Sequence, residues 1–260
     1  MGFGALIVGD EIIRGKRRDG HLVKLIETLA ERGLTLDWAM YLGDDRRRLA
    51  ETLRRTLAGN DVVFSFGGIG ATPDDHTRQA AAEAAGLELV LHPEAEALIR
   101  ARVTDARIAL TPAILRLGEF PRGCAIVPNP CNGIPGFSLG HHYFVPGFPQ
   151  MAWPMVAWIL DTHYADRFDS SPDTEESVIV WDNNESSLLA LMERIERDYP
   201  GVKVFSLPSL GDDTVDKHLE LGVRGKSQRI GAAMDDIREE LLRMGTRFSE
   251  QKKPRSMTGA

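Results

Sequence analysis

The chain has 260 residues, of which 43% are hydrophobic and 27% charged, and its 31 Lys and Arg against 38 Asp and Glu give a formal net charge of −7. This mixture is typical of a globular protein with one large domain, or with one large and one smaller domain. The acidic balance argues against a nucleic-acid partner, which requires a basic face. No apolar run approaches the ~20 residues of a membrane span, so we expect no membrane partner.

Strand and helix patterns alternate through the first part of the chain. Short apolar runs predict strands, and segments with apolar residues along one helical face predict helices between them. The expected strands cover residues 5–8, 35–42 and 61–66, and the expected helices cover residues 22–30, a segment opened by residues 44–45 and an alanine-rich segment that ends at residue 85. Because parallel neighbours need crossover helices, this order predicts an α/β fold with a parallel sheet and helices on both faces.

The region from Cys124 to Pro146 is rich in Pro, Gly and Asn. We expect short strands at residues 123–127 and 142–145, and helices at residues 93–103 and 148–163. These elements complete a first domain over residues 1–165.

A polar segment at residues 167–174 reads as a linker. Beyond it, the pattern predicts strands at residues 178–181, 202–207 and 215–223 and helices at residues 186–199 and 227–244. This order predicts a small α+β domain over residues 176–246, with helices on one face of a largely antiparallel sheet. The polar residues 247–260 are expected to form a disordered tail.

Two cysteines, Cys124 and Cys131, are too few for a disulfide framework, and their spacing is not that of a CxxC redox or zinc pair. They fit a reducing, cytoplasmic location. The segment Met1–Asp10 has no basic residues and meets acid early, so we interpret it as a first strand and not as a signal peptide.

The strongest local feature is the glycine-rich turn Gly67-Gly68-Ile69-Gly70, which follows an expected strand and leads into a helix. Such a turn exposes main-chain N–H groups, and the helix N-terminus adds partial positive charge, so together they suit a phosphate or another anion. The alternative is a plain strand-to-helix connection whose helix is capped by Thr72, Asp74 or Asp75. The turn has neither the GxGxxG pattern of dinucleotide-binding folds nor the Lys-Ser/Thr of a P-loop.

Asp74 and Asp75 need a further explanation, because a carboxylate and a phosphate repel each other. A divalent cation between them would resolve the conflict, as would a carboxylate that acts as a base or as a hydrogen-bond acceptor. No HxxH or HExxH spacing is present in the sequence, so hard oxygen ligands of the magnesium type are favoured over a His/Cys zinc site.

Four separated motifs occur along the first domain. They are Val8-Gly9-Asp10-Glu11-Ile12-Ile13-Arg14-Gly15, Gly43-Asp44-Asp45, the segment from Gly67 to Thr77, and Val145-Pro146-Gly147-Phe148-Pro149. Over roughly residues 1–165 the chain resembles the molybdopterin-binding domain family of MoaB/Mog type, and within it the CinA-like branch (competence/damage-inducible protein A). The resemblance implies a three-layer αβα fold with a mostly parallel sheet, homo-oligomers such as dimers or trimers, and a molybdopterin or an adenine nucleotide as ligand.

The resemblance also implies roles for single residues. In the MoaB/Mog branch two acids serve the pterin-adenylylation site, and by motif they fall on Asp44 and Asp75. The CinA-like branch is associated instead with metal-dependent hydrolysis of a nucleotide pyrophosphate such as ADP-ribose or FAD, and there Asp10 and Glu11 match the acidic pair of the first motif. Asp75, Asp44 and Glu11 would be catalytic, with Asp75 and Asp44 as ligands of Mg²⁺, Mn²⁺ or Co²⁺.

We expect the phosphate-bearing ligand to contact the glycine-rich turn and the residues that the other motifs bring to it. Arg14 is expected to bind phosphate, whereas Lys16, Arg17 and Arg18 are expected in a solvated loop. The predicted binding residues are Gly67, Gly68, Gly70, Thr72, Asp74, Asp10, Arg14, Asn129 and Gly147. Asn129 would read a base or pterin edge or would form a turn, and Gly147 would let the main chain approach phosphate.

Several residues depart from the family's usual pattern. Ala71 stands where proline is usual, and Gly20-His21 replaces the usual Thr-Asn. Gln150 stands where a glutamate often follows the PGxP turn. These departures favour an alternative, a module that binds the pterin or nucleotide without turnover. A third possibility is an interaction protein with a degenerate pocket.

Overall fold

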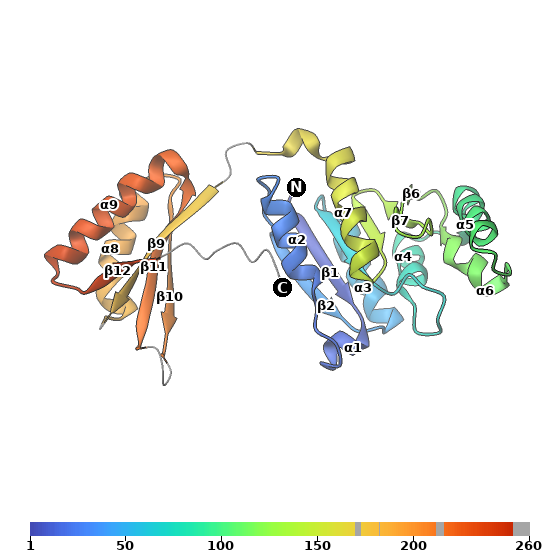
Figure 1. Cartoon of the computed structure of the whole chain (residues 1–260), viewed down its shortest axis with the longest axis horizontal. Helices are drawn as coiled ribbons and strands as arrows, with labels where there is room; N and C mark the ends of the chain where they lie inside the picture. Colours follow the sequence, from blue (N-terminus) through green and yellow to red (C-terminus); the bar gives the residue numbers. More distant parts are fainter. Residues whose placement is uncertain (170–172, 182, 212–215, 252–260) are drawn as a thin grey trace. The chain divides into compact units, whose positions relative to one another are not determined.

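The computed structural model describes residues 1–169, 173–181, 183–211 and 216–251. The chain divides into two compact units, Met1–Asp169 and Ser170–Ala260 (Figure 1). No helix among the described residues is both long enough and apolar enough to span a bilayer.

The first unit is built on a six-stranded sheet in the order β2-β1-β3-β8-β7-β6. Its strands are β1 (Phe3–Val8), β2 (Trp38–Leu42), β3 (Val62–Phe66), β6 (Ala125–Val127), β7 (Gly136–Leu139) and β8 (His142–Val145). β2, β1, β3 and β8 are parallel, and β7 runs antiparallel to both β8 and β6. The mostly parallel sheet is therefore confirmed, with β7 as a strand that the sequence did not predict.

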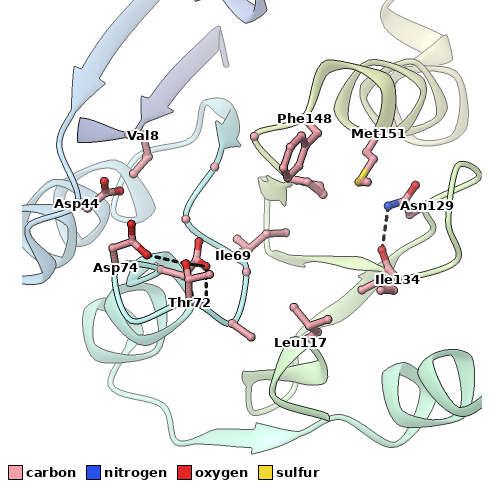
Figure 2. Close-up of a pocket in the computed structure, with 18 of the residues that line it drawn as sticks. Val8, Asp44, Ile69, Thr72, Asp74, Leu117, Asn129, Ile134, Phe148 and Met151 are labelled. Carbon is pink, nitrogen blue, oxygen red and sulfur yellow. Dashed lines mark hydrogen bonds between the residues drawn. The ribbon is translucent and has the colours of Figure 1, made fainter. Parts of the chain in front are cut away.

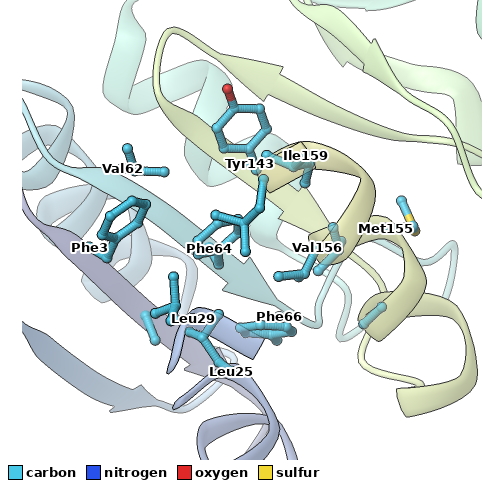
Figure 3. Packing of buried hydrophobic residues seen from close by; sticks show 14 of the residues in the cluster. Phe3, Leu25, Leu29, Val62, Phe64, Phe66, Tyr143, Met155, Val156 and Ile159 are labelled. Carbon is cyan, nitrogen blue, oxygen red and sulfur yellow. The ribbon is translucent and has the colours of Figure 1, made fainter. Parts of the chain in front are cut away.

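Helices cover both faces of this sheet and complete the three αβα layers. α2 (His21–Ala30) and α7 (Pro149–His163) pack on one face, and α3 (Arg46–Leu57) and α4 (Thr77–Ala85) pack on the other. Because side chains alternate along a strand, Phe64 of β3 lies in the first core and Val63 in the second. Figure 3 shows the first core, in which the aromatic rings of β1 and β3 meet Leu25, Leu29, Met155, Val156 and Ile159 of the two helices.

Polar residues precede both α2 and α3, and for α3 the sequence predicts this start at residues 44–45. The side chains of Asp19 and Asp45 accept hydrogen bonds from the first N–H groups of these helices. α4 begins only at Thr77 and has no side-chain cap. The polar side chains just before it bond to one another within their own turn instead. The alternative interpretation of the turn, in which Thr72, Asp74 or Asp75 caps this helix, is therefore wrong.

Between α4 and β6 the chain forms a small lobe that the sequence predicted only in part. The lobe contains the antiparallel strands β4 (Leu89–Leu91) and β5 (Glu119–Pro121) and the helices α5 (Pro93–Ala106), α6 (Pro112–Leu115) and η1, a 3₁₀ helix (Arg116–Gly118). Ala95 and Phe120 join the second core, so the lobe packs on the side of the sheet that α3 and α4 cover. A short helix after β1, α1 (Asp10–Ile13), was also not predicted.

The second unit has a four-stranded antiparallel sheet in the order β10-β11-β9-β12. In chain order its elements are β9 (Asp173–Trp181), α8 (Glu185–Asp198), β10 (Lys203–Ser209), β11 (His218–Lys226), α9 (Ser227–Arg243) and β12 (Phe248–Glu250). α8 and α9 share one hydrophobic core with the sheet, to which they contribute Leu188, Ile195, Ile237 and Leu241. The expected small α+β fold is confirmed.

Two expectations for the second unit are corrected. β9 already begins at Asp173, inside the segment expected to be a linker. β12 pairs with β9, and Phe248 packs against the core, so residues 248–250 are not the disordered tail that their polarity suggested. Residues 252–260 lie outside the described residues, as does Val215, where the strand corresponding to β11 was expected to begin.

Candidate functional site

The carboxyl ends of β1, β3 and β8 meet at one edge of the sheet, which is where crevices form in open α/β folds. A cavity of about 420 Å³ opens there. Its walls come from the loops after these strands and after β2, from the segment between β6 and β7, from η1 and from the start of α7 (Figure 2). Of the predicted site residues, all but Asp10 and Arg14 line this cavity.

Two glycines of the turn after β3 hold a main-chain conformation that other residues rarely adopt. Gly67 has φ 98° and Gly68 has φ 69°. A Cβ atom on Gly67 would collide with the carbonyl oxygen of Val8, and one on Gly68 would collide with Oγ1 of Thr77. The loop after β8 also comes close, since a Cβ atom on Gly147 would lie 3.3 Å from the Cα of Gly67. The turn must therefore be bare main chain at this point.

The same turn presents a run of unpaired hydrogen-bond donors. The N–H of Gly67 donates to the carbonyl oxygen of Val145, and the N–H of Thr72 donates to Oδ2 of Asp75. For the four N–H groups between them, from Gly68 to Ala71, there is no acceptor among the described residues. Successive main-chain donors of this kind can form a concave anion site.

Asp10 and Asp44 hold the loops after β1 and β2 together. The N–H of Asp10 donates to Oδ2 of Asp44 at 2.8 Å, and the N–H of Asp44 donates to Oδ1 of Asp10 at 3.2 Å. Arg14 pairs with Oδ2 of Asp10 at 2.7 Å. The arginine that we expected at the phosphate is therefore engaged by an acid four residues earlier on the same helical face.

Negative charge accumulates around Asp44. Burial raises the pKa of the Asp44 carboxyl. The negative charges of Asp10, Glu11 and Asp74 raise this pKa further, although the hydrogen bond from the Asp10 N–H opposes the rise. A positive charge placed near Asp44 would relieve this repulsion.

A second group of acids lies around Thr72. The Thr72 hydroxyl is 2.5 Å from Oδ1 of Asp74 and 2.5 Å from Oδ2 of Asp75. The hydrogen bond from this hydroxyl lowers the pKa of Asp74. Oδ2 of Asp75 also accepts the Thr72 N–H, so this carboxylate braces the end of the glycine-rich turn.

The cavity wall carries four acids, Glu11, Asp44, Asp74 and Asp75, and one base, Arg17. One base against four acids leaves a formal charge of −3 on the wall. Arg17 belongs to the basic run that we expected in a solvated loop. Asp10 and Arg14 are spaced as an i,i+4 pair on a helix, and this spacing is the sequence signal that Arg14 would pair with Asp10 and not with the phosphate. No group of three or more His, Cys, Asp or Glu side chains within the described part of the chain is arranged to hold a metal ion.

The opposite wall of the cavity is apolar. In Figure 2, the acidic side chains of Asp44 and Asp74 are separated by the cavity from Phe148, Met151 and Ile134. Phe148 is 57% exposed and precedes the first residue of α7. An exposed aromatic face of this kind can stack on a planar ring.

Asn129 lines the cavity, but its amide group is already engaged. Nδ2 donates to Oδ1 of Asn132 and to the carbonyl oxygen of Ile134, and Oδ1 accepts the N–H of Cys131. These contacts match the turn-forming alternative. To read a base edge, Asn129 would have to give up some of them.

His21, which the sequence marked as a departure from the family's pattern, lies next to the site. Its Nε2 lies 3.1 Å from the carbonyl oxygen of Gly147, and its ring stacks on Phe66 with 4.6 Å between the centroids. Burial lowers the pKa of His21, which favours a neutral ring that donates from Nε2 to this carbonyl. His21 thus holds the loop after β8 against the end of β3.

Together these features define a class of protein, an αβα domain whose cavity at the carboxyl edge of the sheet joins a glycine-rich turn to a set of acids. The family described as "probable molybdopterin binding domain" matches residues 4–164, and the chain belongs to this family. The resemblance inferred from the four motifs is confirmed.

Individual relatives include CinA-like proteins. A CinA-like protein of Desulforapulum autotrophicum is 31% identical over 211 residues, which cover 76% of this chain and 49% of that protein. The chain thus spans about half the length of that relative. A protein of Thermoplasma acidophilum is 27% identical over 250 residues, which cover 92% of this chain and 93% of that protein. A solved structure described as the protein CinA with unknown function, from the same organism, superposes with a TM-score of 0.55 at 25% identity, over 62% of this chain and 98% of the other.

Proposed function

We propose that the cavity binds a phosphate-bearing pterin or nucleotide, with phosphate oxygens on the main-chain N–H groups of Gly68 to Ala71. The observation that carries this proposal is the run of four successive unpaired donors in a turn that cannot accommodate side chains at Gly67 and Gly68. Hydrogen bonds from such donors to an oxyanion are charge-assisted and strong. Gly147 brings a second stretch of bare main chain to the same place.

A divalent cation such as Mg²⁺, Mn²⁺ or Co²⁺ would accompany the phosphate. An anion that entered alone would meet a wall of formal charge −3. Burial is the main cause of the raised pKa of Asp44, and the negative charges of Asp10, Glu11 and Asp74 add to it. Carboxylate oxygens are the ligands that these hard cations prefer, and Mg²⁺ is commonly held by one or two carboxylates together with substrate phosphates. Asp44 and Asp75 are the carboxylates that we assign to this task.

The apolar wall would receive the planar part of the ligand. Phe148 offers an exposed ring, and Met151 and Ile134 extend the same surface. A pterin and an adenine both have flat faces that stack on aromatic side chains. The division of the cavity into an acidic wall and an apolar wall therefore matches a ligand with a charged end and a flat end.

As an enzyme, the domain would hydrolyse a nucleotide pyrophosphate such as ADP-ribose or FAD. A bound cation would neutralise the phosphate oxygens as charge develops on them. The turn from Gly68 to Ala71 would hold the pyrophosphate in position, and Glu11, the cavity acid not assigned to the cation among the three expected to be catalytic, would orient a water molecule and take its proton.

A binding module without turnover is the alternative. It rests on the departures at Ala71, Gly20-His21 and Gln150 and on the amide of Asn129, which is committed to its own loop. Self-association into dimers or trimers and a cytoplasmic location stay predictions.

The deciding experiment offers ADP-ribose, FAD and adenylylated pterin to the full chain, with and without Mg²⁺, Mn²⁺ or Co²⁺. Metal-dependent turnover that Asp75→Asn abolishes supports the enzyme. Asp161→Asn is the matched control, because Asp161 pairs with Arg32 away from the cavity. Micromolar binding without turnover supports the module. If no compound binds or reacts, the proposal fails and an interaction protein with a degenerate pocket is favoured.

A further inference from the structure

Arg78 is a charged side chain almost completely enclosed by protein. It lies on the first turn of α4 with 2% of its surface exposed. Its guanidinium donates to the carbonyl oxygens of Gly70 at 2.6 Å, of Glu119 at 3.2 Å and of Arg116. Its Nε has no partner among the described residues. To bury a cation on carbonyl oxygens is unfavourable without compensation, so this arrangement calls for an explanation.

The bond to Gly70 sets the direction of the next N–H group. The peptide bonds of the described residues are trans, and in a planar trans peptide the carbonyl and the following N–H point to opposite sides. Arg78 holds the carbonyl of Gly70 toward its guanidinium, which also donates to the carbonyl oxygens of Arg116 and Glu119. The N–H of Ala71 therefore points away from the guanidinium, and Ala71 is one of the residues that line the cavity.

We propose that Arg78 is a positioning residue of the phosphate site, which aims the N–H of Ala71 into the cavity and makes it a stronger donor. The inference deepens the proposed function and rests on it for the identity of the anion. A cationic donor on a carbonyl draws electron density from that peptide, and this strengthens the N–H on its other side. The buried charge thus strengthens the hydrogen bond from the Ala71 N–H to a phosphate, although the guanidinium does not contact the phosphate.

A neighbouring peptide provides an internal reference. The carbonyl of Gly68 accepts the N–H of Thr77 at 3.0 Å, so the N–H of Ile69 is aimed in the same manner but by a neutral donor. Arg78 donates to the carbonyl of Gly70 and not to that of Gly68, so its charge polarises the first peptide more strongly. Proline, which is usual in the family at the position of Ala71, would have no N–H to aim.

The first test needs no ligand. Amide proton and ¹⁵N shifts of Ala71 and Ile69 are measured in the full chain for the wild type, Arg78→Met and Arg78→Lys. Arg122→Met is the control, because Arg122 pairs with Glu88 in the same lobe and is exposed. We expect the Ala71 resonance to move upfield in Arg78→Met and partly back in Arg78→Lys, with a much smaller change at Ile69. Equal changes at both residues, or none at Ala71, would overturn the inference.

The second test measures affinity for inorganic pyrophosphate with Mg²⁺ by calorimetry. Ala71→Pro deletes the donor and leaves Arg78 in place, and we expect about tenfold weaker binding, the usual size for one charge-assisted hydrogen bond. Binding as tight as in the wild type would overturn the inference. If the wild type does not bind pyrophosphate but its Ala71 resonance responds to Arg78→Met, the proposed function fails while positioning by Arg78 stands.

Discussion

Gly68→Ala tests whether the turn after β3 must be bare main chain. At φ 69° a side chain costs about 1 kcal/mol because of its left-handed conformation. The new Cβ would also collide with Oγ1 of Thr77, whose side chain is fully buried. Overpacking of a buried contact adds about 1–3 kcal/mol. We therefore expect Gly68→Ala to destabilise the first unit by about 2–4 kcal/mol in total.

Gly86→Ala is the matched control for the conformational part of this cost. Gly86 ends α4 at φ 68°, and a Cβ there would meet nothing within 4 Å. It should lose only about 1 kcal/mol. Urea unfolding of the full chain, followed by tryptophan fluorescence, measures both variants, since Trp38, Trp153 and Trp158 report on the first unit.

A double variant separates collision from conformation. Thr77→Ala removes the atom that the new Cβ would strike, so Gly68→Ala with Thr77→Ala should lose less stability than the two single changes added together. A loss for Gly68→Ala no greater than for Gly86→Ala, or strict additivity in the double variant, would refute the packing argument for this turn.

Three further changes address the cavity and the second unit. Phe148→Ala should weaken binding of an adenine nucleotide about tenfold and leave pyrophosphate binding unchanged, because stacking is worth about 1–3 kcal/mol per base; calorimetry with both ligands checks this. Asp44 has a raised pKa, so its ionised form opposes folding at neutral pH and ceases to do so as the carboxyl is protonated. Asp44→Asn should therefore raise the urea midpoint at pH 7, and this advantage should shrink as the pH falls toward the ordinary carboxyl range; a constant difference would contradict it. Gly222→Ala would force a Cβ into the ring of Phe205. We therefore expect faster amide hydrogen exchange in β9 to β11 and unchanged exchange in β1 to β3. Faster exchange in both sheets would show that the two units do not unfold independently.

The central sheet could be predicted because the residues of its main strands form recognisable apolar runs in the sequence. β1 and β3 are buried on both faces and therefore read as continuous apolar runs. β7 could not be found in this way, since Gly136 to Leu139 lie in a segment rich in Pro and Gly and become a strand only by pairing with β6 and β8. β12 is a similar case, because three residues near a polar end gain their structure from β9 and from the burial of Phe248.

The site was predictable in its main chain and less so in its charges. The glycines of the turn after β3 are required by local geometry, which the sequence displays directly. The arginines depend on what else they meet: Arg14 is captured by Asp10 once α1 forms, Arg17 reaches the cavity wall, and Arg78 is buried by a lobe whose strands were not predicted. A charge in a sequence does not tell whether it will face ligand, solvent or another side chain.

Asp75 can have two roles at the site, one structural and one that depends on its charge. Oδ2 of Asp75 accepts the N–H of Thr72 and lies 2.5 Å from the Thr72 hydroxyl, so this residue braces the turn whether or not it also holds a cation. Asp75→Asn keeps an oxygen for the brace and removes the charge, whereas Asp75→Ala removes both. If the charge matters for turnover and the brace for binding, the asparagine variant should lose turnover and still bind pyrophosphate, and only the alanine variant should lose both. Equal behaviour of the two variants would mean that the carboxylate acts in one capacity alone.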